Sequence, residues 1–430
     1  MPELLPTLPK IDWMTSDQTV TLMQALKSNG SDVRFVGGCV RDTILKNQVT
    51  DIDIGTPDPP NIVMNLLKTA NIRSVPTGAT HGTITAIMDT KYFQITSLRR
   101  DIETNGRHAK VTFSDNWVED VKRRDFTINC LSANLDGEIF DPLDGMDDLA
   151  NQKIVFVGNP ADRIKEDHLR ILRFYRFHGL FNSEICDSDG TYACKDNALL
   201  LKRLSKERKR DEFLKILLAK KPAKLVARMQ SDGILDFLLP EAKNVTLLRS
   251  IDYLSRVLLK NFAIKASSLC RLAALLDPFS VDIFEVANTL KLSRNQAIHL
   301  SKICSSQQEI HPNLGLKDEK KIFYGSNVAA LRDIILLQWA RELIRQPKLN
   351  KSQSDGWLNL LKRCQEWHSP NFPLTGRDVL NAGVSPGRTV GEILQHVEDW
   401  WTNSEFMASR DECLNQLKKQ IKQLNIDKKE

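Results

Sequence analysis

The feature that most constrains this chain is a glycine pair between a strand-like segment and a helix-like segment. The run Val36-Gly-Gly-Cys-Val-Arg-Asp42 follows Arg34-Phe-Val36, whose aromatic and β-branched residues favour a short strand. The segment from Thr43 to Lys46 is expected to begin a helix. A Gly-Gly turn at such a junction exposes backbone N–H groups at a helix N-terminus, where anions are stabilised. The sequence therefore predicts a strand–turn–helix unit that can hold a phosphate group.

Two aspartates follow this unit and form a second motif. Asp51 and Asp53 alternate with isoleucines, so both carboxylates are expected on one face of a strand. They would lie about 7 Å apart, and hard oxygen ligands beside a phosphate site suit Mg²⁺. Each motif alone is weak, because a glycine pair is usually a plain turn and Asp-x-Asp also occurs on surface strands and in sugar-nucleotide enzymes. No third glycine completes the dinucleotide-binding pattern G-x-G-x-x-G, so the two motifs together favour nucleotidyl transfer.

Length and composition indicate a folded protein of several domains. The chain has 430 residues, of which 41% are hydrophobic, and this length predicts about two to four domains. No apolar run is long enough to span a membrane, and the N-terminus lacks the basic start of a signal peptide. The eight cysteines show no CxxC or Cys/His metal spacing, so a disulfide framework or zinc site is not expected. Reduced thiols and a cytoplasmic location are the expectation.

The charge is distributed unevenly along the chain. Residues 1–150 contain 15 Lys and Arg against 21 Asp and Glu, a balance of −6. Residues 151–430 contain 45 against 33, a balance of +12. Solvated helix faces alone could produce such a split. Beside a nucleotidyl-transfer motif in the acidic part, the basic part favours a nucleic acid as partner.

The secondary-structure pattern changes at about the same place. Up to about residue 155, short β-branched segments alternate with helical stretches such as Asn61 to Ala70, which predicts an α+β fold with a mixed sheet. From about residue 160 onward the apolar spacing is helical, as at Phe213, Ile216 and Leu217. The expected strands are 34–36, 51–54, 82–88, 92–96, 110–113 and 138–140.

Several motifs, in order along the chain, resemble one family. They are Gly37-Gly-Cys-Val-Arg-Asp42 with Asp51-Ile-Asp53, Lys122-Arg-Arg-Asp-Phe-Thr-Ile-Asn129, Asp141-Pro-Leu-Asp-Gly-Met-Asp-Asp-Leu149, Arg163-Ile-Lys-Glu-Asp-His-Leu-Arg-Ile-Leu-Arg-Phe-Tyr-Arg-Phe177, Ser205-Lys-Glu-Arg208 with Glu212-Phe213, and Pro373-Leu-Thr-Gly-Arg-Asp-Val-Leu380. The chain resembles the bacterial class II tRNA nucleotidyltransferases, the CCA-adding enzymes, which share their N-terminal half with poly(A) polymerases. This resemblance implies a polymerase-β-like catalytic head at 1–155, a helical neck at 156–225 with a nucleobase-selecting motif, a helical body at 226–340 and a helical, tRNA-binding tail at 341–430.

The resemblance also implies an activity and its parts. The enzyme would add CCA to the 3′ end of tRNA without a nucleic-acid template, using CTP and ATP and releasing pyrophosphate. Asp51 and Asp53 would hold Mg²⁺ for two-metal phosphoryl transfer. Gly38 and Arg41 would hold the triphosphate. Arg124 would reach the same phosphates, since its planar guanidinium matches phosphate oxygens, although a surface Arg-Arg pair is the plainer interpretation of that segment.

A stripe of charged residues is the expected base-selecting element. Asp167, Arg170, Arg173 and Arg176 are spaced by three, which predicts that they lie close to one helix stripe. An ordinary amphipathic helix is the alternative, because apolar residues between them supply a buried side. The resemblance assigns Asp167 and Arg170 to the Watson–Crick edge of the incoming base. A bidentate set of this kind discriminates by about 1–3 kcal/mol, and Arg173 and Arg176 would hold phosphates or position the pair.

One position departs from the family pattern. Related enzymes often carry a glutamate in the strand that contains Gln94 here, and a neutral amide is a poorer magnesium ligand than a carboxylate. Asp101, Asp120 or no residue would compensate, so only two aspartates are assigned to the metal.

The stretch from Arg100 to Asp120 is expected to be a polar hairpin or mobile loop, and His108 a loop residue without a ligand role. In CCA-adding relatives a flexible loop near here serves the switch from C to A addition.

The C-terminal half is less informative. It has no His-Asp doublet, so the phosphohydrolase domain of some relatives is not expected. Trp400, Trp401 and Phe406 are expected to pack between helices in preference to stacking on RNA. The predicted contacts with the tRNA backbone are Arg377, Lys418, Lys419 and Lys422.

Other functions remain open at this level. A poly(A) polymerase would share the head motifs, and a partial enzyme would add only CC or A. A non-catalytic RNA-binding module is a third class, which the intact aspartate pair disfavours. An obligate protein partner and a membrane are not expected.

Overall fold

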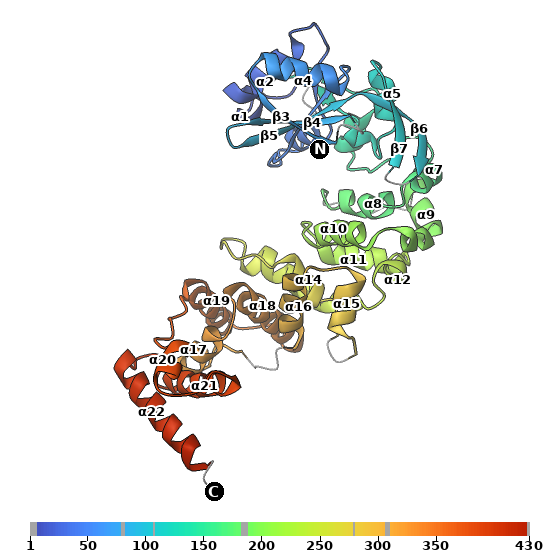
Figure 1. Cartoon of the computed structure of the whole chain (residues 1–430). Coiled ribbons are helices and arrows are strands. Elements are labelled where there is room, and N and C mark those ends of the chain that lie inside the picture. The colour runs from blue at the N-terminus through green and yellow to red at the C-terminus, as the bar shows by residue number, and fades with distance from the viewer. Residues whose placement is uncertain are drawn as a thin grey trace. The chain divides into compact units, whose positions relative to one another are not determined.

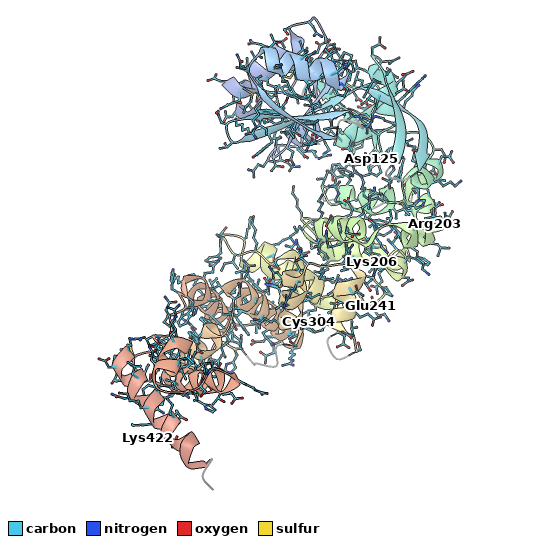
Figure 2. All side chains as sticks on the ribbon, in the orientation of Figure 1. Asp125, Arg203, Lys206, Glu241, Cys304 and Lys422 are labelled. Carbon is cyan, nitrogen blue, oxygen red and sulfur yellow. The ribbon has the colours of Figure 1, made fainter. Side chains whose placement is uncertain are left out.

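The computed structural model describes residues 7–78, 82–105, 108–181, 188–277, 280–305 and 310–427, with only the backbone described at 101–111 and 424–427 inside these ranges. The chain divides into two compact units, Met1–Pro240 and Glu241–Glu430. Figure 2 labels Glu241, where the second unit begins. Two boundaries expected from the sequence fall inside helices: 225/226 lies in α11 (Pro222–Ser231) and 340/341 lies in α18 (Val328–Arg345). These two boundaries therefore do not coincide with breaks in the chain's helices.

The first unit is built on a seven-stranded sheet, ordered β3-β4-β5-β2-β1-β8-β9. Figure 1 labels β3, β4 and β5 of this sheet. Strands β2 and β5 are parallel and the other neighbouring pairs are antiparallel, so the predicted mixed sheet is confirmed. The strands of this sheet are β1 (Arg34–Val36), β2 (Ile52–Thr56), β3 (Arg73–Gly78), β4 (Thr83–Met88), β5 (Lys91–Ser97), β8 (Ser132–Ala133) and β9 (Ile139–Phe140).

Strand β3 was not expected from the sequence. It contains Pro76 and is mostly exposed, which is unusual for a strand inside a sheet. Its position at the sheet edge explains both properties, because an edge strand tolerates a residue without an N–H group. The central strands behave differently: Phe35, Ile54 and Phe93 are fully buried and form the core under the predicted phosphate turn.

Helices cover this sheet and continue beyond it. Helix α4 packs against β3 and β4, and α2 packs against α4 (Figure 1). The helical segments of the first unit are α1 (Asp12–Thr15), α2 (Asp17–Lys27), α3 (Gly38–Ile44), α4 (Pro60–Thr69), α5 (Trp117–Lys122), α6 (Gly145–Ala150), α7 (Pro160–Glu166), α8 (Arg170–His178), α9 (Asp189–Asp196), α10 (Lys206–Leu217), α11 and α12 (Leu235–Leu238), with short 3-10 turns η2 (Thr127–Asn129) and η3 (Ala198–Arg203). The change to helical structure near residue 160 is confirmed.

The polar stretch that follows β5 contains a hairpin. Strands β6 (Arg99–Asn105) and β7 (His108–Phe113) pair antiparallel as a separate two-stranded sheet. Residues 106–107 and the side chains of Asp101 and His108 lie outside the described part, so the roles expected for those two residues stay untested. Helix α5 then begins where the Asn116 side chain accepts hydrogen bonds from the backbone N–H groups of Val118 and Glu119. Arg123 and Arg124 follow directly after the last residue of α5.

The second unit is helical in its described residues. Its elements are α13 (Val245–Tyr253), the π-helical turn η4 (Leu254–Leu258), α14 (Ser268–Ala273), α15 (Ile283–Thr289), α16 (Arg294–Ser305), α17 (Leu316–Tyr324), α18, α19 (Lys351–Glu366), α20 (Gly376–Asn381), α21 (Arg388–Asn403) and α22 (Arg410–Asp427). Trp401 is buried against Tyr324 and Phe406, and its indole N–H donates to the Ala408 carbonyl at 3.1 Å. The expected helix-packing role of this aromatic group is confirmed. Among the described helices, none is both long and apolar enough to cross a bilayer.

Candidate active site

The phosphate turn differs from the prediction in where its helix begins. Helix α3 starts at Gly38, five residues before the predicted start, because the Arg41 N–H already donates to the Gly37 carbonyl at 3.0 Å. The segment that begins at Thr43 is the end of this helix. Gly37 has a φ of 68°, and a Cβ atom there would lie 3.1 Å from Nη1 of Arg124. This position therefore needs glycine for its backbone angle and for the close approach of an arginine.

Of the two aspartates, only Asp53 lies in β2, which begins at Ile52, one residue later than expected. Asp53 is half-buried and pairs in register with Gln94 of the parallel strand β5, while Asp51 is exposed just before the strand. Burial raises the pKa of Asp53 above its ordinary value, the Asp51 carboxylate raises it further, and Arg124 partly offsets both effects. The charges of Asp51 and Asp53 therefore influence each other. Gln94, next to Asp53 in the sheet, is exposed and carries no charge.

Asp120 does not replace the missing glutamate. It is buried, and its two oxygens pair with Arg123 at 2.7 Å and Arg124 at 3.0 Å. Burial alone would raise the pKa of Asp120, but the two guanidinium groups lower it below the usual range. Asp120 therefore orients arginines. In the described ranges, no three His, Cys, Asp or Glu side chains gather as a metal-binding group.

The expected base-selecting stripe is not one continuous helix. Helix α7 ends at Glu166, and Asp167 has an extended backbone with φ −147° and ψ 105°. Its Oδ1 accepts the N–H of Leu169 at 3.1 Å, a local bond that competes with helix continuation. Helix α8 then begins at Arg170. The prediction of a shared stripe is thus wrong for Asp167, which lies in the break, and correct for the three arginines that follow.

Asp53, Asp167 and the three arginines of α8 line one cavity of about 540 Å³ in the first unit, whereas Asp51 is not among its lining residues. This volume lies within the roughly 300–1,000 Å³ typical of small-molecule sites. The charged lining consists of seven arginines and three aspartates: Arg41, Arg99, Arg123, Arg124, Arg170, Arg173, Arg176, Asp53, Asp125 and Asp167. Gly37 and Gly38 complete its phosphate side. The excess of positive charge suits a polyanionic ligand such as a triphosphate.

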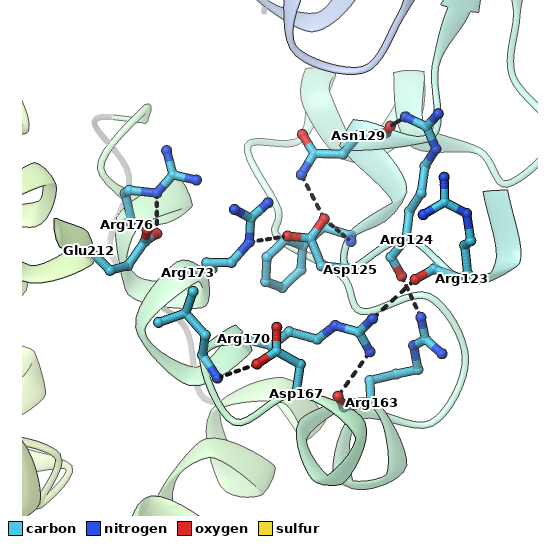
Figure 3. Close-up of polar contacts among 12 residues, drawn as sticks. Arg123, Arg124, Asp125, Asn129, Arg163, Asp167, Arg170, Arg173, Arg176 and Glu212 are labelled. Carbon is cyan, nitrogen blue, oxygen red and sulfur yellow. Dashed lines mark hydrogen bonds and ion pairs between the residues drawn. The ribbon is translucent and has the colours of Figure 1, made fainter. Parts of the chain in front are cut away.

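Each arginine of α8 has a partner that holds its direction (Figure 3). Arg170 pairs with Glu166 at 2.7 Å and also donates to the carbonyls of Arg163 and Arg123. Arg173 pairs with Asp125 at 2.6 Å, and Arg176 pairs with Glu212 of α10. The guanidinium groups of Arg41, Arg173 and Arg176 also surround the Phe177 ring, at 5.0, 5.2 and 4.3 Å from its centroid.

Sequence reasoning missed these partners. Asp125, Asn129, Arg208 and Glu212 lie in the motifs quoted above, yet no role could be assigned to them from spacing. Arg208 of α10 donates to Oδ2 of Asp167 at 2.8 Å across 41 residues. The sequence feature that could have indicated these partners is that carboxylates and arginines occur in the same motifs. Which of them pair is decided by the tertiary structure.

The predicted RNA contacts all lie in the second unit. Arg377 is on α20, and Lys418, Lys419 and Lys422 are on α22, where Figure 2 labels Lys422. All four side chains are exposed. Their exposure is compatible with a contact to a nucleic-acid backbone, and their assignment stays a prediction.

Comparison with known proteins gives a consistent result. Residues 33–155 match the model of the poly A polymerase head domain, and residues 189–246 match a probable RNA and SrmB-binding site of polymerase A. The human mitochondrial CCA tRNA nucleotidyltransferase 1 is 31% identical over 423 residues, covering 96% of this chain and 92% of the relative. The CCA-adding enzyme of Limosilactobacillus reuteri (strain DSM 20016) is 30% identical over 394 residues, with 90% and 92% covered.

A solved structure shows the same fold. The CCA-adding enzyme of Bacillus stearothermophilus, crystallised with CTP, superposes with a TM-score of 0.68 at 23% identity and covers 95% of this chain and 98% of its own. The mixed sheet, phosphate turn and charged cavity define a nucleotidyltransferase with a head of the poly(A) polymerase type. The similarity of this chain to its relatives along nearly its whole length identifies a narrower family. The chain belongs to the tRNA nucleotidyltransferases, the family of CCA-adding enzymes.

Proposed function

We propose that this protein adds CCA to the 3′ end of tRNA, using CTP and ATP and releasing pyrophosphate. The observation that carries the proposal is that one cavity is lined by Asp53, by the arginine cluster, which includes Arg170, and by Asp167. Membership of the CCA-adding family supports tRNA as the acceptor and CTP and ATP as donors. The expected cytoplasmic location remains a prediction, since some relatives are named as mitochondrial proteins.

The residues around the phosphate turn suit a triphosphate. Gly37 and Gly38 open the first turn of α3, whose N–H groups favour an anion. Arg124 and Arg41 lie close to this turn: a Cβ atom at Gly37 would be 3.1 Å from Nη1 of Arg124, and one at Gly38 would be 3.8 Å from Nη2 of Arg41. Their planar guanidinium groups match phosphate oxygens. With the triphosphate held here, the RNA 3′-hydroxyl attacks the α-phosphorus, the bond to the bridging oxygen breaks, and pyrophosphate leaves in line. These arginines would offset the negative charge that pyrophosphate carries as it leaves.

The aspartate pair suits a magnesium site. The raised pKa of Asp53 shows that burial and Asp51 make its charged form costly, a cost that a bound cation would remove. Mg²⁺ is commonly held by one or two carboxylates together with substrate phosphates, so a two-aspartate set fits it. When bound, Mg²⁺ would neutralise phosphate charge and favour ionisation of the attacking hydroxyl. Asp51 and Asp53 are the residues that we assign to it.

Base choice is assigned to Asp167 and Arg170. Asp167 accepts bonds from Leu169 and Arg208, and a carboxylate has about four acceptor sites, so capacity remains for the exocyclic amine of a base. Arg170 has five N–H donors, and the bonds described use three of them, to Glu166 and to the carbonyls of Arg163 and Arg123. The remaining donors can meet a ring-nitrogen acceptor. Cytosine and adenine share this amine-plus-acceptor edge, whereas uracil and guanine present a carbonyl and an N–H.

One assay tests the proposal against its alternatives. Purified protein is given tRNA that ends before CCA, with CTP, ATP or both, and product lengths are read on a sequencing gel. Three additions with both nucleotides support CCA addition, while a stop at CC, or A added only to tRNA ending in CC, indicates a partial enzyme. A long A-tail on generic RNA indicates a poly(A) polymerase, and no product from folded protein indicates a non-catalytic module.

The matching control is Asp53→Ala. It is expected to abolish incorporation while the thermal unfolding profile stays close to that of the wild type, because Asp53 has no ion pair within the described residues. Normal turnover in purified Asp53→Ala would refute the assignment of the metal site.

A further inference from the structure

Asn129 is an uncharged residue in the lining of the charged cavity. Its side chain is buried, and it lines the cavity beside the phosphate turn. Its Oδ1 accepts a hydrogen bond from Nη1 of Arg41, and its Nδ2 donates to Oδ1 of Asp125 at 2.9 Å. Its backbone carbonyl accepts from Nη1 of Arg124 at 2.9 Å (Figure 3). One residue thus contacts three of the charged groups of the cavity.

These contacts link two distant parts of the first unit. On one side, Arg41 belongs to α3 and pairs with Asp42 at 2.7 Å. On the other side, Asp125 pairs with Arg173 of α8 at 2.6 Å. The Arg41–Asn129 bond spans 88 residues of sequence. Asn129 therefore connects the helix of the phosphate turn with the arginine face of α8.

The chemistry of this link requires an amide. A primary amide carries an acceptor and a donor on the same planar group, so it can satisfy a guanidinium and a carboxylate together. Aspartate at this position could still accept from Arg41, but would place a second carboxylate against Asp125. Serine would be too short to span both partners. The neutral amide also leaves the Asp125 carboxylate ionised and paired with Arg173.

We propose that Asn129 is a positioning residue, which ties Arg41 to the Asp125–Arg173 pair and thereby sets how the cavity grips the triphosphate. The inference rests on the proposed function, because that function assigns Arg41 to the triphosphate. Asn129 acts through Arg41, whose contact is with the phosphates common to all nucleotides. Its loss should therefore weaken CTP and ATP equally and leave base selection unchanged, unlike the loss of Asp167.

The test compares Asn129→Asp and Asn129→Ser with the wild type in single-nucleotide addition to tRNA. We expect KM for CTP and for ATP to rise by the same factor, about 10- to 100-fold, because bonds to charged partners are lost or opposed. The preference for CTP over UTP should stay within about two-fold of wild type, since Asp167 and Arg170 are untouched. Asn129→Ser carries the same expectation if Asn129→Asp does not fold. Unchanged KM in a folded variant would overturn the proposal.

A double substitution separates positioning from simple filling of space. Asp125→Asn combined with Asn129→Asp exchanges the amide and the carboxylate and keeps the net charge. The double variant should be less impaired than the product of the two single losses, because the like-charge contact of Asn129→Asp is gone. Losses that simply multiply would show that the donor–acceptor link has no role.

The matched control is Asn134→Asp, outside the cavity. The Asn134 amide also donates to a carboxylate, Oε2 of Glu138, at 3.0 Å, and its Oδ1 accepts backbone N–H groups. The same chemical change there should leave KM unaltered. Equilibrium titration with CTP, without tRNA, keeps the two proposals distinct. If the wild type binds CTP tightly and Asn129→Ser binds it more weakly, the role of Asn129 is supported even when no CCA is added. If both proteins bind CTP equally well, the role of Asn129 is refuted.

Discussion

The ion pair between Arg208 and Asp167 gives a quantitative prediction about base selection. Nη2 of Arg208 lies 2.8 Å from Oδ2 of Asp167, and the two side chains are 24% and 23% exposed. Arg208 does not line the cavity, so it acts on the nucleotide only by holding Asp167. We predict that Arg208→Met lowers selectivity for CTP and ATP because the Asp167 carboxylate loses its fixed direction.

The size of the effect follows from the exposure of the pair. A fully exposed pair contributes about 0.2–1 kcal/mol, and a hydrogen bond to a charged group about 1.5–3 kcal/mol. A pair one-quarter exposed should lie between these values, at about 1–2 kcal/mol, which corresponds to roughly 5- to 30-fold in rate. This loss should appear in kcat/KM for CTP and ATP. UTP, which lacks the amine that Asp167 would accept, should be unaffected.

The assay measures kcat/KM for CTP and UTP on tRNA that lacks CCA. Arg210→Met is the matched control, since Arg210 lies on the same helix, pairs with Asp211 at 2.7 Å and is outside the cavity lining. In an Asp167→Ala background, Arg208→Met should have no further effect on selectivity. A CTP/UTP ratio in folded Arg208→Met that stays within two-fold of the wild-type ratio would refute the reasoning.

Three further predictions test other parts of the site. Gly37→Ala should destabilise the protein by about 1–3 kcal/mol, because the positive φ disfavours any side chain and the new Cβ would lie 3.1 Å from an arginine nitrogen. Thermal unfolding measures this loss. Gly38→Ala is the control and should show a much smaller loss, because its Cβ would have ordinary contacts. Burial alone would raise the pKa of Asp125, but its arginine partner and the neighbouring amide and backbone bonds lower it. The ionised Asp125 side chain therefore stabilises the fold fully above the unfolded-state pKa of about 3.9, and this stabilisation is lost as pH falls below that value. The unfolding free energy of Asp125→Asn should depend less on pH between about 5 and 3 than that of the wild type. An unchanged slope would contradict this. Replacing Lys418 and Lys419 by glutamine should reduce the salt dependence of tRNA binding by about 1.5 in the slope of log K against log salt, and an identical slope would remove both residues from the RNA contact.

Local chain geometry accounts for what could be predicted well. The period-two alternation around Asp53 correctly placed it on a strand, and the glycine pair correctly marked a strand–turn–helix junction. Apolar spacing correctly made Phe213, Ile216 and Leu217 one buried helix face. These features depend on neighbours within a few residues, which the sequence shows directly.

The errors have equally local causes. The start of α3 was placed too late, because glycine at the first helical position gives no propensity signal. The break at Asp167 was missed, because a spacing of three is the same whether or not a carboxylate captures a nearby N–H. Strand β3 was missed because Pro76 disfavours strands except at an edge, and edge position is a property of the whole sheet.

The sequence by itself determined the chemistry available to this protein: a phosphate turn, an aspartate pair, and arginines beside a carboxylate for base choice. Only the tertiary structure decided which charged groups are available to a ligand and which serve each other. Asp120 is taken up by two arginines, Arg208 directs Asp167, and Asn129 joins Arg41 to Asp125. Two of these contacts span 41 and 88 residues of sequence. No periodicity encodes such pairs, because they form only when separate elements pack around one cavity.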